Sequence, residues 1–306
     1  AGPRAAFMKR LVLGTRGSDL ALAQTRLIAA QLRTATPALE IEQKIIRTTG
    51  DERLDVSLSA PGSLDKGLFT KELEEALLRG EIDAAVHSLK DLPVDQPAGL
   101  IIGAIPKRED PGDVLVSKAD GGLDALPHGA AVATSSLRRK CFLLAHRPDL
   151  AIHDIRGNVP TRIRKLAESS TLAALVLATA GLRRLKAADV ALALEGLHVS
   201  PLEFILPAPG QGAIAIECRA NDEATLTALA AIHDEATSDC VRAERAVLAG
   251  LGGGCHMPLG ALANFTEGSL FLRAVWFPDA AANLRTAEHR GAWREAAAAV
   301  VTQLTA

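Results

Sequence analysis

Residues 11–24 have the sequence LVLGTRGSDLALAQ, in which an apolar run ends at a polar turn with an arginine and a helical pattern follows. Two later stretches repeat this order, AVATSSLRR at residues 131–139 and IHDIRGNVPTR at residues 152–162. Short apolar runs that alternate with amphipathic helical patterns are typical of an α/β fold. The three stretches therefore predict an α/β protein whose strands lead directly into helices.

Each stretch also predicts a helix N-terminus with an arginine beside it. Ser18, Ser135 and Asn158 are residue types that commonly cap a helix, and Pro160 suits a first helical turn. The free N–H groups of a helix start attract anions, and a guanidinium can bind a carboxylate or a phosphate through two hydrogen bonds. A single arginine in such a place is most often an ordinary surface charge. The repetition favours a ligand with several negative groups.

The composition excludes several classes of function. The chain has 306 residues, enough for two or three domains, and its 34 Lys and Arg against 36 Asp and Glu leave a net charge of −2. This balance gives no overall attraction to nucleic acid or to an anionic membrane. Aromatic residues make up 3% of the chain, which leaves few for base stacking. The apolar run at residues 172–182 is too short to span a bilayer, and residues 1–7 are expected to lie outside the fold.

The four cysteines, Cys141, Cys218, Cys240 and Cys255, show neither a CxxC pair nor the spacing of zinc ligands. We therefore expect reduced thiols in the cytoplasm and no metal site. Three glycines precede Cys255 and permit a close approach of the backbone to a bulky group, which makes this cysteine a candidate functional residue. The alternative is an inert cysteine in a turn.

The apolar pattern predicts the other elements and two linkers. Residues 106–113 and residues 207–210 are broken by prolines and are predicted to connect domains, with a second α/β unit from residue 114 to about residue 206. The predicted strands are 11–14, 41–48, 82–86, 211–217 and 270–275, and the predicted helices are 19–33, 69–79, a pair within 222–251, and one from residue 292.

Lys90 and Asp91 follow the predicted strand at residues 82–86 and lie in a turn that ends at Pro93. Ligands of α/β proteins gather at the carboxyl ends of strands, where a carboxylate could accept an N–H hydrogen bond or stabilise a cation. An aspartate that only shapes the turn is the alternative. His87 is expected to be a core or hydrogen-bonding residue. The chain has neither a Walker-type loop nor a GxGxxG motif, so nucleotide chemistry is not expected.

Nine motifs, in order along the chain from about residue 10 to the C-terminus, resemble those of one enzyme family. They are TRGSDLALAQ (15–24), KGLFTKEL (66–73), AVHSLKDLP (85–93), KREDP (107–111), TSSLRR (134–139), RGNV (156–159), AGLRR (180–184), GQGA (210–213) and GGC (253–255). Together they are similar to the porphobilinogen deaminase (hydroxymethylbilane synthase) family. The departures lie away from the catalytic positions: residues 168–172 replace an acidic, aromatic turn, and the tail after Trp293 looks short.

The resemblance implies a cytoplasmic, monomeric transferase of porphyrin and heme biosynthesis. Cys255 would carry a dipyrromethane cofactor through a thioether. Four porphobilinogen molecules would then add one by one, each with loss of ammonia, and hydrolysis would release the linear tetrapyrrole hydroxymethylbilane. Porphobilinogen would be the small-molecule partner, with neither nucleic acid nor membrane as a further one.

The resemblance also implies roles for individual residues. Asp91 would be catalytic, bonding the pyrrole N–H groups and stabilising the azafulvenium cation that remains when ammonia departs. The residues expected to hold the cofactor are Cys255, Lys90, Ser88, Ser136, Arg138, Arg139 and Arg162. The residues expected to bind substrate are Arg16, Ser18, Gln24, Phe69, Arg156, Arg184 and Gln211. The arginines would hold the acetate and propionate groups of the pyrroles.

The implied fold has three domains. Residues 8–108 with 207–230 and residues 109–206 would resemble the two lobes of a type II periplasmic binding protein with the cleft between them. Residues 231–306 would form a smaller α/β domain with the cysteine loop. That fold leaves a non-catalytic clamp for a polycarboxylate as an alternative. A local nucleic-acid binder with basic clusters at 138–140, 162–165 and 183–184 is a further one, which the few aromatic residues disfavour.

Overall fold

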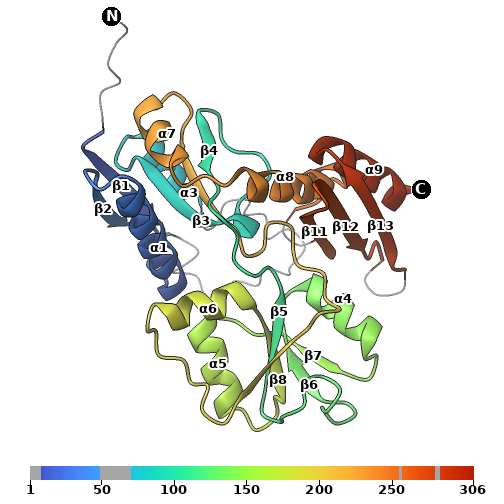
Figure 1. Ribbon diagram of the computed structural model, residues 1–306. Helices are drawn as coiled ribbons and strands as arrows, with labels where there is room; N and C mark the ends of the chain where they lie inside the picture. Colours follow the sequence, from blue (N-terminus) through green and yellow to red (C-terminus); the bar gives the residue numbers. More distant parts are fainter. Residues whose placement is uncertain (1–7, 49–69, 255–256, 280–282) are drawn as a thin grey trace, which may run out of the picture. The chain divides into compact units, whose positions relative to one another are not determined.

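The turn after the first strand joins it to a helix, as the sequence predicts (Figure 1). Strand β1 (Arg10–Thr15) buries Leu11 and Leu13, and helix α1 (Asp19–Ala35) begins after Ser18, whose hydroxyl accepts a hydrogen bond from the N–H of Ala21. The computed structural model describes residues 8–48, 70–254, 257–279 and 283–306. By its internal contacts the chain divides into two compact units, Ala1–Arg108 with Ala213–Ser238 and Glu109–Gly212 with Asp239–Ala306.

The first unit contains a five-stranded sheet with helices on both faces. The strand order is β2-β1-β3-β10-β4, with β2 (Glu40–Ile45), β3 (Ala84–Ser88), β10 (Ile214–Arg219) and β4 (Leu100–Ala104). Strands β2 and β3 run parallel to β1, and β10 runs antiparallel to β3 and β4. Helices α1 and α7 (Glu223–Ala230) contribute to the core on one face, and α3 (Lys71–Leu78) contributes to a core on the other. Because β1 and β3 are parallel, the loops that follow them leave the same edge of the sheet.

The second unit contains a sheet of the same plan. Its strand order is β7-β6-β8-β5-β9, with β7 (Ala151–His153), β6 (Ala131–Ala133), β8 (Ala174–Ala178), β5 (Asp113–Ser117) and β9 (His198–Pro201). Strands β7, β6 and β8 are parallel, and β5 is antiparallel to β8 and β9. Helices α4 (Leu137–His146), α5 (Val159–Glu168) and α6 (Thr179–Ala187) follow β6, β7 and β8. Each of these helix starts is therefore held at the carboxyl end of a strand.

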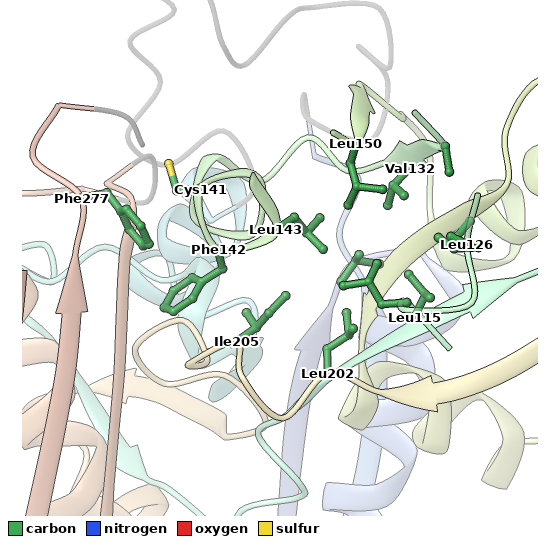
Figure 2. Close-up of a cluster of buried hydrophobic side chains, with 14 residues drawn as sticks. Leu115, Leu126, Val132, Cys141, Phe142, Leu143, Leu150, Leu202, Ile205 and Phe277 are labelled. Carbon is green, nitrogen blue, oxygen red and sulfur yellow. The ribbon is translucent and has the colours of Figure 1, made fainter. Parts of the chain in front are cut away.

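A smaller antiparallel sheet completes the second unit. Its strands β11 (Leu259–Thr266), β12 (Ser269–Trp276) and β13 (Arg285–Gly291) pack their apolar side chains against α8 (Glu235–Gly250) and α9 (Trp293–Thr305). Phe277, directly after β12, enters the same core as Cys141, Phe142 and Leu143 of α4 (Figure 2). Its ring meets that of Phe142 edge to face, with centroids 5.0 Å apart.

The structure confirms the α/β class and most of the predicted elements, with ends shifted by a few residues. The strand predicted at residues 82–86 occupies Ala84–Ser88, and α3 ends just before Gly80, whose φ of +69° suits glycine. One prediction is wrong at its end: residue Asp113, assigned to a linker, is buried and begins β5. Among the described residues, no helix combines the length and the apolar character needed to cross a membrane. The boundaries of three domains stay a prediction.

Candidate functional site

The first group of predicted site residues lies where β1 and β3 end. Arg16 and Ser18 follow β1, and Ser88 is the last residue of β3. Gln24 is buried on α1 and its Nε2 donates a hydrogen bond to Ser88 Oγ at 2.9 Å. This bond joins the first turns of α1 to the carboxyl end of β3. The structure therefore brings Gln24 and Ser88 into contact and places the Arg16 turn at the same edge of the sheet.

Lys90 and Asp91 lie in a 3-10 turn, Leu89–Asp91, directly after β3. Leu89 is fully buried, and its N–H donates to the carbonyl of Ala213 at 3.1 Å, just before β10. The buried Leu89 side chain and its backbone hydrogen bond therefore hold the turn, while Lys90 is half-buried and Asp91 is exposed. A fixed backbone with an exposed carboxylate can meet a ligand without rearranging the strand.

His87 is buried, as its sequence context predicts. Its Nε2 lies 3.2 Å from Oε2 of Glu217, which is fully buried on the neighbouring strand β10. Burial raises the pKa of Glu74 on α3, and the charge of Glu217 raises it further. Among the described residues, no group of three or more His, Cys, Asp or Glu side chains could hold a metal ion.

In the second unit, Arg138 and Arg139 lie in the first turn of α4 and are both buried, at 4% and 6% exposure. Each donates from Nη2 to one carboxylate oxygen of Asp113, at 2.7 Å in both cases. Their Nη1 atoms donate to the carbonyls of Leu206, at 2.6 Å, and Val176, at 3.0 Å. Two guanidinium groups therefore share one carboxylate away from solvent.

The two arginines of this cluster lower the pKa of Asp113. Burial alone would raise that pKa, but the charges of Arg138 and Arg139 and their hydrogen bonds outweigh burial and hold it well below its usual range. Burial lowers the pKa of Arg138, and Asp113 only partly offsets this. The cluster thus keeps an ionised aspartate and an excess positive charge in the interior.

Arg156 and Arg162 flank the start of α5. Asn158 caps this helix, and its Oδ1 accepts a hydrogen bond from the N–H of Thr161 at 2.9 Å. Arg162 is half-buried, and its Nε donates to the carbonyl of Gly157 at 2.7 Å. Gly157 has a φ of +112°, a conformation that only glycine adopts readily, so this turn requires it. The helix cap, Arg156 and Arg162 therefore all belong to the turn before α5 and its first helical turn.

Arg184 and Gln211 hold the segment before β10. The Nη2 of Arg184 donates to the carbonyl of Gly212 at 2.7 Å, and burial lowers the pKa of Arg184 to about 10. Gln211 is buried, and its Nε2 donates to Pro111 O at 2.7 Å and to Asp113 Oδ1 at 2.9 Å. Among the described residues, the buried Nε atoms of Arg138, Arg139 and Arg184 have no hydrogen-bond partner.

One predicted helix cap is wrong by a single position. Ser136, not Ser135, caps α4, because its hydroxyl accepts from the N–H of Arg139. Ser135 instead exchanges two hydrogen bonds with the backbone of Ile155, at 2.8 and 3.0 Å. Ser135 thereby ties the start of α4 to the turn that carries Arg156. Ser136, predicted to help hold the cofactor, lies on the same turn as Arg138 and Arg139.

The basic clusters differ in how much charge they offer to solvent. At residues 138–140 only Lys140 is exposed, since both arginines are buried with Asp113. Arg183 is exposed but forms ion pairs with Glu109 and Asp110, each at 3.0 Å. In the cluster at residues 162–165, Arg164 and Lys165 are exposed. Two predicted site residues, Phe69 and Cys255, lie outside the described residues.

Sequence reasoning missed Asp113, which contacts three of the predicted site residues. The residue stands at the end of a charged segment with two prolines, which favoured a solvated linker. The available signal was an aspartate immediately before the apolar run Val114–Val116, because a strand start can bury such a side chain when arginines pair with it.

Two family models match the chain. One, described as porphobilinogen deaminase, dipyromethane cofactor binding domain, matches residues 11–227, and the other, porphobilinogen deaminase, C-terminal domain, matches residues 238–305. The porphobilinogen deaminase of Desulforudis audaxviator is 52% identical over 267 residues, which cover 87% of this chain and 84% of that protein. The porphobilinogen deaminase of Brevibacillus brevis is 50% identical over 262 residues, with 85% and 82% covered.

Matches among solved structures have low sequence identity. The effector binding domain of BenM with benzoate matches with a TM-score of 0.44 and 19% identity, over 74% of this chain and 91% of that one. The methionine binding protein MetQ matches with a TM-score of 0.45 and 14% identity, over 75% and 92%.

Proposed function

The chain belongs to the porphobilinogen deaminase family, and from this premise we propose that it is a transferase that joins four porphobilinogen molecules head to tail. Each condensation releases ammonia, and hydrolysis yields the linear tetrapyrrole hydroxymethylbilane. The observation that carries this proposal is the agreement of both family domains with nearly the whole chain. The geometry of the two units supports it at the level of residues.

The cofactor-binding domain of the family takes a dipyrromethane, which supplies the free pyrrole α-carbon that accepts substrate. We place its thioether link at Cys255, since three glycines precede that residue. The described residues suit a ligand that carries several carboxylates. Arg138 and Arg139 share the single carboxylate of Asp113, so one positive charge is left over beside the helix start of α4.

The remaining cofactor contacts are assigned to Lys90, Ser88, Ser136 and Arg162. Ser88 and Lys90 follow one another closely at the end of β3, and Ser136 caps α4 beside the two buried arginines. Hydroxyl and ammonium donors of this kind bind carboxylates well, because each hydrogen bond is assisted by charge. The buried Nε of Arg139 is a further donor whose partner a bound carboxylate could supply.

Substrate binding is assigned to three other arginines. Arg16 and Arg156 precede the starts of α1 and α5, and Arg184 lies in the last turn of α6. Ser18, Gln24, Gln211 and Phe69 complete the proposed set. Each porphobilinogen brings an acetate and a propionate, and a guanidinium can hold such a group by two hydrogen bonds. Helix N-termini add a favourable field for the same anions.

Asp91 is the proposed catalytic residue. Its carboxylate is exposed on a turn whose backbone is anchored by buried Leu89. A carboxylate held there can accept the pyrrole N–H and stabilise the cation that remains on the substrate when ammonia leaves. A fixed negative charge acts more strongly on the transition state than a mobile one, because it needs no reorganisation during the reaction.

We propose further that the protein works in the cytoplasm as a monomer, without a nucleic-acid partner. Cys141, Cys218 and Cys240 are buried free thiols, which suits a reducing compartment. The near-neutral net charge gives no overall attraction to a nucleic acid, and the pairing of Arg138 and Arg139 with Asp113 keeps these two charges away from the surface.

Incubation with porphobilinogen tests the proposed function. We expect the protein to release ammonia in proportion to the pyrrole consumed and to form a linear tetrapyrrole. A non-catalytic clamp for polycarboxylates would bind porphobilinogen but form neither product, and that result would overturn the proposal.

A further inference from the structure

One carboxylate organises three separate segments of the second unit. Asp113 begins β5 and is 2% exposed. It accepts hydrogen bonds from Arg138 and Arg139 of α4, both at 2.7 Å, and from Gln211 of the segment before β10, at 2.9 Å. All three donors belong to the set that is proposed to meet the cofactor or the substrate.

The arrangement is unfavourable for stability alone. Two cations lie in the first turn of a helix, where the helix dipole is positive, and both are removed from water. A single carboxylate cannot neutralise them both. Apolar side chains of similar size in such a place are often neutral or better for folding. The unfavourable burial of two cations indicates that these guanidinium groups serve function rather than stability.

The geometry limits how each guanidinium can face a ligand. In both arginines Nη2 is bound to Asp113 and Nη1 to a carbonyl, Leu206 O for Arg138 and Val176 O for Arg139. These bonds fix the plane of each group, and the buried Nε atoms remain without a hydrogen-bond partner. Removal of the Asp113 carboxylate would release one of the two fixed points of each arginine.

We propose that Asp113 is a positioning residue for the cofactor, which acts by holding Arg138 and Arg139 in the orientation that receives its carboxylates. This inference rests on the proposed function. Asp113 does not itself touch the cofactor. Its contribution is geometric, because its own charge repels the carboxylates that the arginines attract.

Charge and geometry predict opposite effects of an Asp113 variant on cofactor binding, so the direction of the change in binding tests the proposal. Asp113→Asn removes a negative charge and leaves the site more positive by one unit. If only the net charge mattered, the variant would bind an anionic cofactor better than the wild type. If Asp113 positions the arginines, the variant binds it worse, although the site is more positive.

The experiment compares the wild type, Asp113→Asn, Asp113→Glu and the matched control Asp149→Asn. Asp149 also pairs with an arginine of this unit, Arg147, at 2.7 and 2.8 Å, but it contacts no proposed site residue. The apoproteins are incubated with porphobilinogen, and intact-protein mass gives the fraction that carries the two-pyrrole adduct. Thermal unfolding and the KM of the loaded fraction are measured in parallel.

We expect adduct loading to fall on the order of tenfold or more in Asp113→Asn, as for other residues that orient a ligand's direct partners. Asp113→Glu keeps the charge but shifts the carboxylate by one methylene, so its adduct loading should lie between that of the wild type and that of Asp113→Asn. Asp149→Asn should load normally, even if its unfolding temperature falls. Loading in Asp113→Asn equal to or above that of the wild type would overturn the proposal, as would an equal loss in Asp149→Asn.

Two further outcomes stay informative. If Asp113→Asn does not fold, Asp113→Glu decides, since normal loading in that variant contradicts a positioning role. If the wild type neither carries an adduct nor consumes porphobilinogen, the proposed function itself fails. The positioning role of Asp113 is refuted separately, if its variants load normally while the wild type is loaded and active.

Discussion

At the scale of single residues, the types of the site residues could be predicted but their environment could not. Arg138 and Arg139 were expected as ligand-binding arginines, and the structure shows both buried against Asp113. Arginine is rarely buried unless it is paired, and here the partner of these two helical residues begins strand β5. A sequence pattern reports neighbours along the chain, so it could not place Asp113 beside α4.

Asp91 gives the first prediction at this scale. Asp91→Asn keeps the size of the side chain and removes the charge that would face a cationic intermediate. We expect the variant to fold and to turn over porphobilinogen about a hundredfold to a thousandfold more slowly, which corresponds to about 3–4 kcal/mol. Steady-state kinetics measure this.

Asp95→Asn is a matched control, because Asp95 is also exposed and lies four residues further along the same loop. It should retain normal turnover. Normal turnover in Asp91→Asn as well would show that Asp91 only shapes the turn.

The arginines give the second prediction. Arg16, Arg156 and Arg162 should each tolerate lysine poorly, because lysine keeps the charge but lacks the planar fork that fits a carboxylate. Variants at positions that grip the cofactor should lower adduct loading, and those that meet substrate should stall the series of enzyme-bound intermediates. Mass spectrometry of the variants separates the two classes.

Arg164→Lys serves as the control, since Arg164 is exposed on the same helix as Arg162. An exposed ion pair contributes at most about 1 kcal/mol, so this change should be silent. Normal activity and a normal series of intermediates in all three test variants would refute a polycarboxylate site.

At the scale of elements, local signals predicted well and long-range pairing did not. Ser18 and Asn158 cap α1 and α5 as expected, since capping depends on residues within one helical turn. By contrast, β5 and β10 each enter a sheet antiparallel to its other central strands. Such a strand is decided by partners distant in the sequence, which no local periodicity records.

The cap of α5 gives the third prediction. Asn158→Ala removes the acceptor for the N–H of Thr161, a bond of 2.9 Å, and should destabilise the protein by about 1 kcal/mol. Asn158→Gly should cost only a few tenths of that, because glycine leaves the helix start open to water. Denaturant unfolding compares the two variants with the wild type, and equal stability of all three would show that the cap contributes nothing. Asn158→Ala should also raise the KM for porphobilinogen, since the cap shapes the turn that carries Arg156.

At the scale of the whole molecule, the order of nine short motifs predicted the family, and both family models agree with it. Fold class followed from alternating patterns. By its contacts the chain forms two units, each built from two separate stretches of sequence, and the boundaries of three domains stay a prediction. Packing such as that of Phe277 against Phe142 joins stretches far apart in the chain and has no local signature.

If the protein carries a dipyrromethane on Cys255, intact-protein mass spectrometry detects it. We expect a mass above that of the sequence by a two-pyrrole adduct, which peptide mapping places on Cys255, and a Cys255→Ser variant that folds without adduct or activity. An unmodified Cys255 in protein that is active on porphobilinogen would contradict it.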